Sequence, residues 1–255
     1  MSESVILCEG YHDRAFWAGW LLHLGCTDPG LPPVGRTTRT PINDPWGDRV
    51  TGGQFAYLSN TKQFIRVRPC HGKSNILAAA RIRLRERTSK RLLQLVINVD
   101  PDVSTAGTGT GATGLQRQDV LQLAHTFDPA AAFNADRNVE VDGGATIVAL
   151  VRWETNDPPA PGLPDQQTLE RLVSAALVAA YPPRAKAVQD WLDTRPNPPA
   201  VDPKEHGWSY MAGWYAGHGC EDFYANLWRD VAVVGELESR LRLSGAWQIA
   251  EAVAG

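Results

Sequence analysis

The chain has 255 residues, of which 43% are hydrophobic and 21% are charged, and its formal net charge is −3. This length accommodates one large domain, or a core domain with an extension, and the composition is typical of a globular protein. No apolar run approaches the roughly 20 residues needed to cross a bilayer, so we expect no membrane-spanning segment. The acidic balance argues against a general polyanion binder.

Two features predict a cytoplasmic protein. Glu3 stands where a signal peptide would carry positive charge, so we expect no export signal. The cysteines lie far apart and form no CxxC motif, which favours free thiols in a reducing compartment. They are Cys8, Cys26, Cys70 and Cys220.

The first part of the chain alternates strand and helix patterns. Residues 5–7 indicate a buried strand, and Gly10 allows a sharp turn at its end. An apolar helical pattern follows from Asp13 and ends at Gly25. Residues 27–53 are rich in Pro, Gly and Thr and predict a long loop.

The middle of the chain continues this alternation. Residues 55–58 and 64–68 suggest a hairpin, and Ser74 is a candidate N-cap for a helix that runs to about Arg87. Residues 92–99 are almost all apolar, as in a central parallel strand covered on both faces. Later patterns predict a Gly/Thr-rich loop over 104–114, a helix over 115–125, and strands over 139–141 and 145–153.

The composition changes at Asp157, where a proline cluster interrupts the pattern. Helical patterns follow over 169–177 and 185–192, and a tryptophan-rich tail ends the chain. We therefore predict an α/β core in residues 1–156, with a mostly parallel sheet flanked by helices. A helical extension in residues 157–255 is expected to pack on this core and form one compact unit with it.

Acidic residues follow two of the predicted strands. Glu9 follows the first strand and precedes Asp13, while Asp100 and Asp102 follow the strand over 92–99. In open α/β sheets, ligands bind at the carboxyl ends of the strands. Two carboxylates about 4 Å apart repel by about 4 kcal/mol at an effective dielectric constant of about 20, so a cluster needs protons or a cation. Oxygen-only ligands suit Mg²⁺ or Mn²⁺.

Ordinary structural roles remain open for these carboxylates. Asp-Pro is common turn chemistry, which accounts equally well for Asp100 and Asp102. A carboxylate in the first turn of a helix, such as Asp13, is favoured by the helix dipole. Glu9 closes a buried strand, where an apolar or small residue would cost less, and is harder to explain in this way.

The order strand-Glu9-Gly10-x-x-Asp13-helix, then strand-Asp100-x-Asp102, resembles the Toprim domain of topoisomerases, primases and OLD-family nucleases. Two later segments of this sequence also resemble small stand-alone Toprim proteins related to the OLD nucleases. These are Gly72-Lys73-Ser74-Asn75 and Gly162-Leu-Pro…Leu169-Glu170.

The resemblance implies a Toprim-like, Rossmann-like fold and Mg²⁺- or Mn²⁺-dependent phosphodiester cleavage of DNA or RNA. Asp100 and Asp102 would hold metal, with Glu170 a ligand for a second ion, and two ions would clamp the attacking and leaving oxygens. Glu9 would bind metal or act as general acid or base. Asp13 would also belong to the catalytic site, as a metal ligand or as a carboxylate that supports the ligands. Lys73 would stabilise phosphate charge, or is simply a solvated lysine at a helix start.

The family context is phage defence or nucleic-acid maintenance. The ATPase domain of true OLD enzymes is absent from this sequence, so an energy-coupled role would require an ATPase partner protein. The alternative is a non-catalytic or partner-dependent Toprim module with a binding or regulatory role.

A basic segment offers a second link to nucleic acid. Residues 66–91 carry nine basic residues and one acidic residue. The alternating arginines in this segment indicate a nucleic-acid track or, equally well, a solvated surface. These are Arg81, Arg83, Arg85 and Arg87.

Three other motifs are weaker. Residues 109–114 match GxGxxG, but they do not directly follow a strand, as a dinucleotide fingerprint requires. Residues 71–74 resemble the end of a P-loop, but Val67 replaces its first glycine. His218 and Cys220 have no partner pair at zinc spacing.

Overall fold

The structure is a computed structural model that describes residues 2–27, 42–43, 49–50, 55–102, 114–159, 165–194, 211, 214 and 219–255. The chain divides into two compact units. The first contains residues 1–98, 116–151 and 249–255, and the second contains residues 99–115 and 152–248. This division differs from the predicted boundary at residue 157, because two segments belong to the unit on the other side of that boundary. Residues 99–115 belong with the later part of the chain, and residues 249–255 belong with the earlier part.

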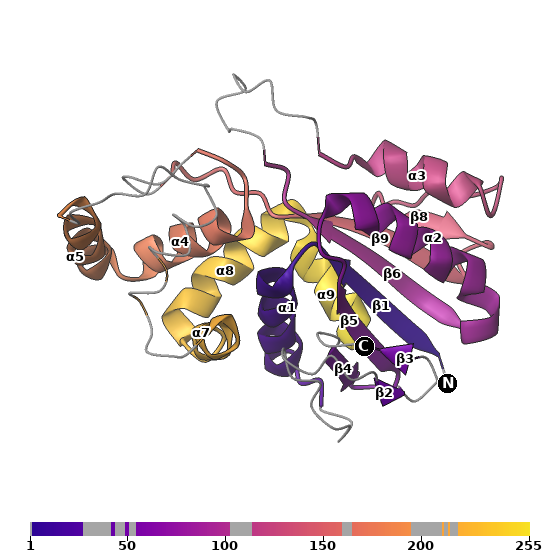
Figure 1. Ribbon diagram of the computed structural model, residues 1–255, viewed down its shortest axis with the longest axis horizontal. Helices are drawn as coiled ribbons and strands as arrows, with labels where there is room; N and C mark the ends of the chain where they lie inside the picture. Colours follow the sequence, from indigo (N-terminus) through magenta and orange to yellow (C-terminus); the bar gives the residue numbers. More distant parts are fainter. Residues whose placement is uncertain are drawn as a thin grey trace. The chain divides into compact units, whose positions relative to one another are not determined.

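A seven-stranded sheet organises the first unit, in the order β4-β5-β1-β6-β9-β8-β7 (Figure 1). Its strands are β1 (Glu3–Cys8), β4 (Phe55–Leu58), β5 (Phe64–Pro69), β6 (Leu92–Val99), β7 (Ala132–Phe133), β8 (Val139–Val141) and β9 (Thr146–Arg152).

The centre of the sheet is parallel. Strand β1 pairs in parallel with both β5 and β6. Thr146 donates to the Leu92 carbonyl where β9 and β6 begin, and Trp153 N–H donates to the Val99 carbonyl where they end, so these strands are also parallel. Antiparallel pairing is confined to β4 on one side and to β8 and β7 on the other. The predicted α/β fold with a mostly parallel sheet is therefore confirmed.

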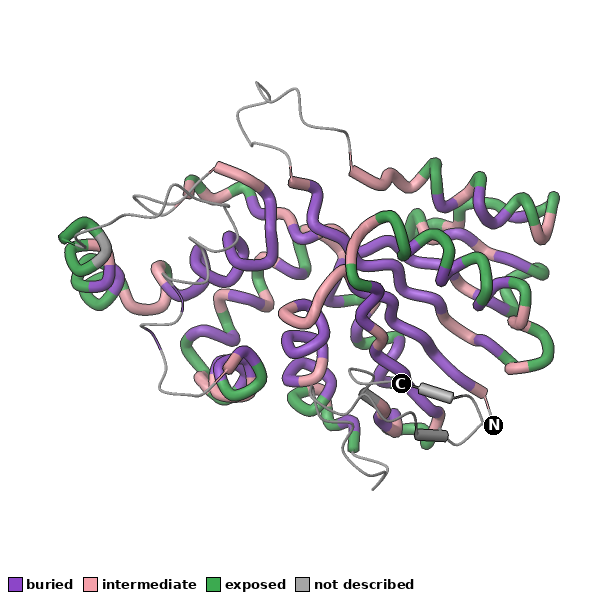
Figure 2. The backbone as a smooth tube through the Cα atoms, viewed as in Figure 1, coloured by how far each residue is buried: buried purple, intermediate pink, exposed green. Residues whose placement is uncertain are grey.

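Helices cover this sheet on both faces. They are α1 (Tyr11–His23), α2 (Lys73–Lys90), α3 (Arg117–His125) and the end of α9 (Ala246–Ala254). In the strand order, β5 lies on one side of β1 and β6 lies on the other. The crossover from β1 to β5 and the crossover from β5 to β6 therefore run in opposite directions across the sheet. Since such crossovers are right-handed, α1 and α2 lie on opposite faces. Figure 2 shows the central strands buried and the outer side of α2 exposed.

Burial of apolar side chains accounts for the position of most of these helices and strands. An ion pair accounts for the additional length of one strand. Phe16, Trp17 and Trp20 of α1 are fully buried. Strand β1 begins two residues before its apolar run, because buried Glu3 and Arg66 form an ion pair at 3.6 Å between β1 and β5. Helix α2 begins at Lys73 after an N-cap at Gly72, so Ser74 is not the N-cap that we expected. The long predicted loop contains a short antiparallel pair, β2 (Ile42–Asn43) with β3 (Arg49–Val50).

The second unit is mainly helical. Its helices are α4 (Leu169–Ala180), α5 (Pro182–Asp193), α7 (Cys220–Leu227) and α8 (Val231–Ser244). Helix α4 packs against α8 and α5. Trp214, Trp228 and Trp247 are buried, as predicted for the tail, whereas Trp208 lies outside the described residues. None of the described helices is both long and apolar enough to cross a bilayer.

Candidate active site at the strand ends

The two acidic motifs follow neighbouring parallel strands. Cys8 at the end of β1 is in register with Asn98 near the end of β6. Glu9 is the next residue after Cys8, and Asp100 comes two residues after Asn98. Both motifs therefore begin at the carboxyl ends of adjacent strands, as the sequence predicts, and this is the edge where ligands bind in α/β sheets.

Glu9 and Lys73 lie at one end of the first unit. The Cys70 N–H donates to the Cys8 carbonyl at 2.8 Å, and the Gly72 N–H donates to the Glu9 carbonyl at 3.0 Å. These bonds fasten the loop after β5 to the end of β1. Since Lys73 follows Gly72 directly, the structure brings the start of α2 to the backbone of Glu9. The side chains of Glu9 and Lys73 are both half-buried.

Asp13 stabilises the turn that follows Glu9. Its Oδ2 accepts a hydrogen bond from the Gly10 N–H at 2.9 Å, and the carboxylate is buried. This is the helix-start role that the sequence leaves open for Asp13. Burial, reinforced by the nearby charge of Asp13, raises the pKa of Cys8 well above its ordinary value, so this thiol stays protonated.

Asp100 lies at the start of α4 in the second unit, next to the residue before Glu170. The buried Asp100 accepts a hydrogen bond on Oδ1 from the Leu169 N–H at 2.9 Å. Glu170 is the next residue and is also buried, in the first turn of α4. The Asp102 N–H donates to the Gln167 carbonyl at 3.1 Å. The structure thus brings Asp100 and Asp102 to the helix start that carries Glu170.

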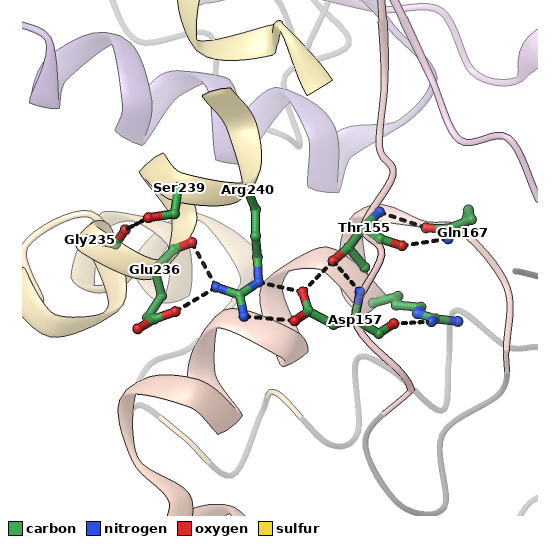
Figure 3. Close-up of polar contacts among 8 residues, drawn as sticks. Thr155, Asp157, Gln167, Gly235, Glu236, Ser239 and Arg240 are labelled. Carbon is green, nitrogen blue, oxygen red and sulfur yellow. Dashed lines mark hydrogen bonds and ion pairs between the residues drawn. The ribbon is translucent and has the colours of Figure 1, made fainter. Parts of the chain in front are cut away.

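A polar network holds the segment leading into α4 (Figure 3). Thr155 and Gln167 exchange two hydrogen bonds, of 2.9 and 2.8 Å. Asp157 accepts hydrogen bonds of 2.7 and 3.1 Å from Arg240 of α8, and its backbone carbonyl accepts one from Arg171 of α4. Burial alone would raise the pKa of Asp157, but hydrogen bonds from Arg240 and Thr155 prevail and lower it.

This network predicts a pH-dependent contribution to stability. Arg240→Ala should lower the free energy of unfolding at pH 7 by about 1–2 kcal/mol, because Arg240 is mostly buried while Asp157 is partly exposed. The folded pKa of Asp157 lies below the ordinary 3.8, so this contribution is complete above about pH 4 and disappears as pH falls further.

Urea denaturation from pH 7 down to pH 3 measures this effect. The control is Lys186→Ala, which breaks the exposed Lys186–Asp190 pair and should cost less than about 0.5 kcal/mol. An Arg240→Ala protein as stable as the control would contradict the assignment.

The four arginines of α2 divide into two faces. Arg83 is buried and pairs with Glu86 at 3.3 Å. Arg87 donates to both carboxylate oxygens of Asp142 and, through these hydrogen bonds, lowers the pKa of Asp142. Arg81 and Arg85 are exposed one turn apart. Of the four arginines, Arg81 and Arg85 are the two that are exposed to solvent, as a nucleic-acid track requires.

Carboxylate oxygens are the donors that Mg²⁺ prefers, so the donor type at the start of α4 fits the predicted metal. However, no group of three or more His, Cys, Asp or Glu side chains that could hold a metal ion occurs among the described residues. Among the described residues, carboxylates of a suitable type are therefore present, but they are not gathered into a group of three or more. Residues 109–113, Gly162 and His218 lie outside the described residues.

Sequence reasoning missed two kinds of residue here. Tyr11 and His71 contact each other next to Glu9 and Lys73, with ring centroids 5.3 Å apart. The signal that could have identified them is their position in the sequence, close to Glu9 and Lys73. Arg240 and Asp157 are 83 residues apart, and no local pattern links them.

Comparisons with known proteins bear on the fold. No protein-family model matches the chain, and no curated protein is significantly similar to it. Among solved structures, the chain is similar to a hypothetical protein from Pyrococcus horikoshii OT3. The identity is 15%, the TM-score is 0.67, and the match covers 100% of both chains. This likeness supports the α/β fold over the full length of the chain.

Proposed function

We propose that the protein is a Toprim-like nuclease that cleaves phosphodiester bonds of DNA or RNA with Mg²⁺ or Mn²⁺. One observation carries the proposal: Glu9 and Asp100 follow adjacent parallel strands, in which Cys8 at the end of β1 is in register with Asn98 near the end of β6. Carboxylates that approach each other within about 4 Å at such an edge repel strongly unless a cation or a proton neutralises them.

Each residue has a role in this proposal. Asp100, Asp102 and Glu170 supply carboxylate oxygens for metal, and Glu9 is a further ligand or moves a proton at the reacting oxygen. Asp13 holds the turn behind Glu9 through the Gly10 N–H. Lys73 stabilises phosphate charge beside Glu9. The bound metal would supply Lewis-acid stabilisation of the developing negative charge.

The exposed face of α2 is the proposed phosphate-binding surface. Replacing Arg81 and Arg85 together by Ala should weaken nucleic-acid binding and reduce the salt slope of log Kd by about 1.4–1.8, because two phosphate contacts are lost. Fluorescence anisotropy at several salt concentrations measures this slope. Arg229→Ala removes one exposed arginine from α7–α8 and is the control. An unchanged slope in the double variant would place the phosphate contacts elsewhere.

A non-catalytic or partner-dependent Toprim module is the second candidate. The observation favouring it is that Asp13 and Asp100 each accept a backbone N–H at a helix start, a structural role that needs no metal. Such a protein would bind nucleic acid or regulate a partner, such as an ATPase in phage defence or nucleic-acid maintenance.

Cleavage assays separate the two candidates. Single- and double-stranded DNA and RNA should be incubated with Mg²⁺, Mn²⁺ or EDTA, alone and with nucleotide-hydrolysing partner candidates. Metal-dependent cutting that disappears in Glu9→Gln supports the nuclease. Binding without cutting under every condition, unchanged in Glu9→Gln, supports the binding module.

A further inference from the structure

An aromatic pair lies beside Glu9 and has no role in the proposed chemistry. Tyr11 is the first residue of α1, and His71 belongs to the loop between β5 and α2. Their ring planes meet at 68° in an edge-to-face contact. His71 is exposed and Tyr11 is half-buried, so the pair lies at the surface and is not part of the core.

The backbone fixes the position of His71. Its φ of 57° lies in the left-handed region, which is uncommon for residues other than glycine. The hydrogen bonds of Cys70 and Gly72 to the end of β1 hold the residues on either side of it. Asn75 also donates to the His71 carbonyl at 3.2 Å. The imidazole is therefore presented from a constrained loop.

Tyr11 is supported from within the first unit. The guanidinium carbon of Arg14 lies 5.0 Å from the centroid of the Tyr11 ring, at cation–π distance, and Arg14 is fully buried. The Tyr11 ring thus has a buried cation against it and His71 at its side. A rigid aromatic surface of this kind loses little entropy when a planar ligand stacks on it.

We propose that Tyr11 and His71 form a stacking platform for an unpaired nucleobase of the substrate. This inference rests on the proposed nuclease function and adds a substrate class to it, namely single-stranded nucleic acid or a frayed end. Aromatic side chains that stack bases are the usual means of binding single strands, because a base in a duplex has no accessible face. Glu9 and Lys73 next to the pair place the stacked base beside the phosphate that reacts.

Other uses of the pair fit the observations less well. A packing role would bury His71, which is exposed. Zinc binding would need further His or Cys ligands, and no metal-holding group occurs among the described residues. A purely electrostatic role would not require an aromatic partner for His71.

The test compares two oligonucleotides of equal length and charge, one of thymidine nucleotides and one of abasic nucleotides, with metal removed by EDTA. His71→Asn tolerates the left-handed backbone but removes the ring, whereas His71→Phe keeps an aromatic ring. His23→Asn, at the exposed far end of α1, is the control. Anisotropy gives each Kd.

Stacking predicts that His71→Asn weakens binding of the thymidine oligonucleotide about fivefold or more and leaves abasic binding unchanged. His71→Phe should bind like the wild type, and Tyr11→Leu should behave like His71→Asn. Equal weakening for both oligonucleotides, no weakening at all, or a His71→Phe protein as weak as His71→Asn would overturn the platform.

The two proposals fail in different ways. A wild-type protein that cuts nucleic acid while His71→Asn binds normally overturns the platform and leaves the nuclease standing. A wild-type protein that neither binds nor cuts either type of strand overturns both proposals.

Discussion

Glu9→Gln is expected to lower the rate of metal-dependent cleavage at least about 100-fold. The substitution keeps the shape of the side chain but removes its charge and its ability to transfer a proton, and general acid–base help is worth at least about this factor. The fold should survive, because Gln is nearly isosteric with Glu and the hydrogen bond from the Gly72 N–H is made to the backbone carbonyl of Glu9.

Single-turnover cleavage at saturating protein measures this loss without interference from binding. Asp136→Asn, which neutralises an exposed carboxylate in the loop before β8, is the control and should cut at the wild-type rate. Equal rates for Glu9→Gln and the wild type would remove Glu9 from the chemistry.

Asp100→Asn is expected to abolish the stabilisation of the protein by Mn²⁺. A metal present at 100 times its Kd raises the free energy of unfolding by about 2.7 kcal/mol, so the wild-type melting temperature should rise clearly. Asn keeps an oxygen that can accept from the Leu169 N–H, so the start of α4 should remain intact. A melting temperature that no longer rises with Mn²⁺ would then be due to the lost negative charge of Asp100.

Asp100→Ala separates the structural role of Asp100 from metal binding. It removes the acceptor for Leu169 as well as the charge, and should destabilise the metal-free protein by about 1–2 kcal/mol. Thermal melts with EDTA and with Mn²⁺ provide both comparisons, with Asp136→Asn again as the control. An Asp100→Asn protein that responds to Mn²⁺ like the wild type would exclude Asp100 as a ligand.

Local patterns were sufficient to predict the central part of the fold. The apolar runs of β1 and β6 and the spacing of Phe16, Trp17 and Trp20 in α1 encode burial directly. Helix α4 begins where its apolar pattern begins, and the Thr168 side chain caps it by accepting from the Arg171 N–H. These signals lie within a few residues of the elements that they specify.

Long-range contacts account for what the sequence did not show. Nothing near Asp157 indicates that Arg240 binds it, and nothing near residue 99 indicates that the segment joins the second unit. The alternating arginines of α2 gave no means of separating exposed Arg81 and Arg85 from Arg83 and Arg87, because their partners Glu86 and Asp142 were not evident. The strand-end position of Glu9 and Asp100 followed from order alone, whereas the helix-start role of Asp100 depends on Leu169, 69 residues away.

Anomalous diffraction at the manganese edge, from crystals of the wild-type protein grown with Mn²⁺, tests the proposed metal site most directly. We predict an anomalous peak coordinated by Asp100 together with Asp102 or Glu170, and its loss in Asp100→Asn crystals. A peak bound by other residues, or none at saturating Mn²⁺ while Asp100 still accepts from Leu169, would contradict the metal-dependent nuclease.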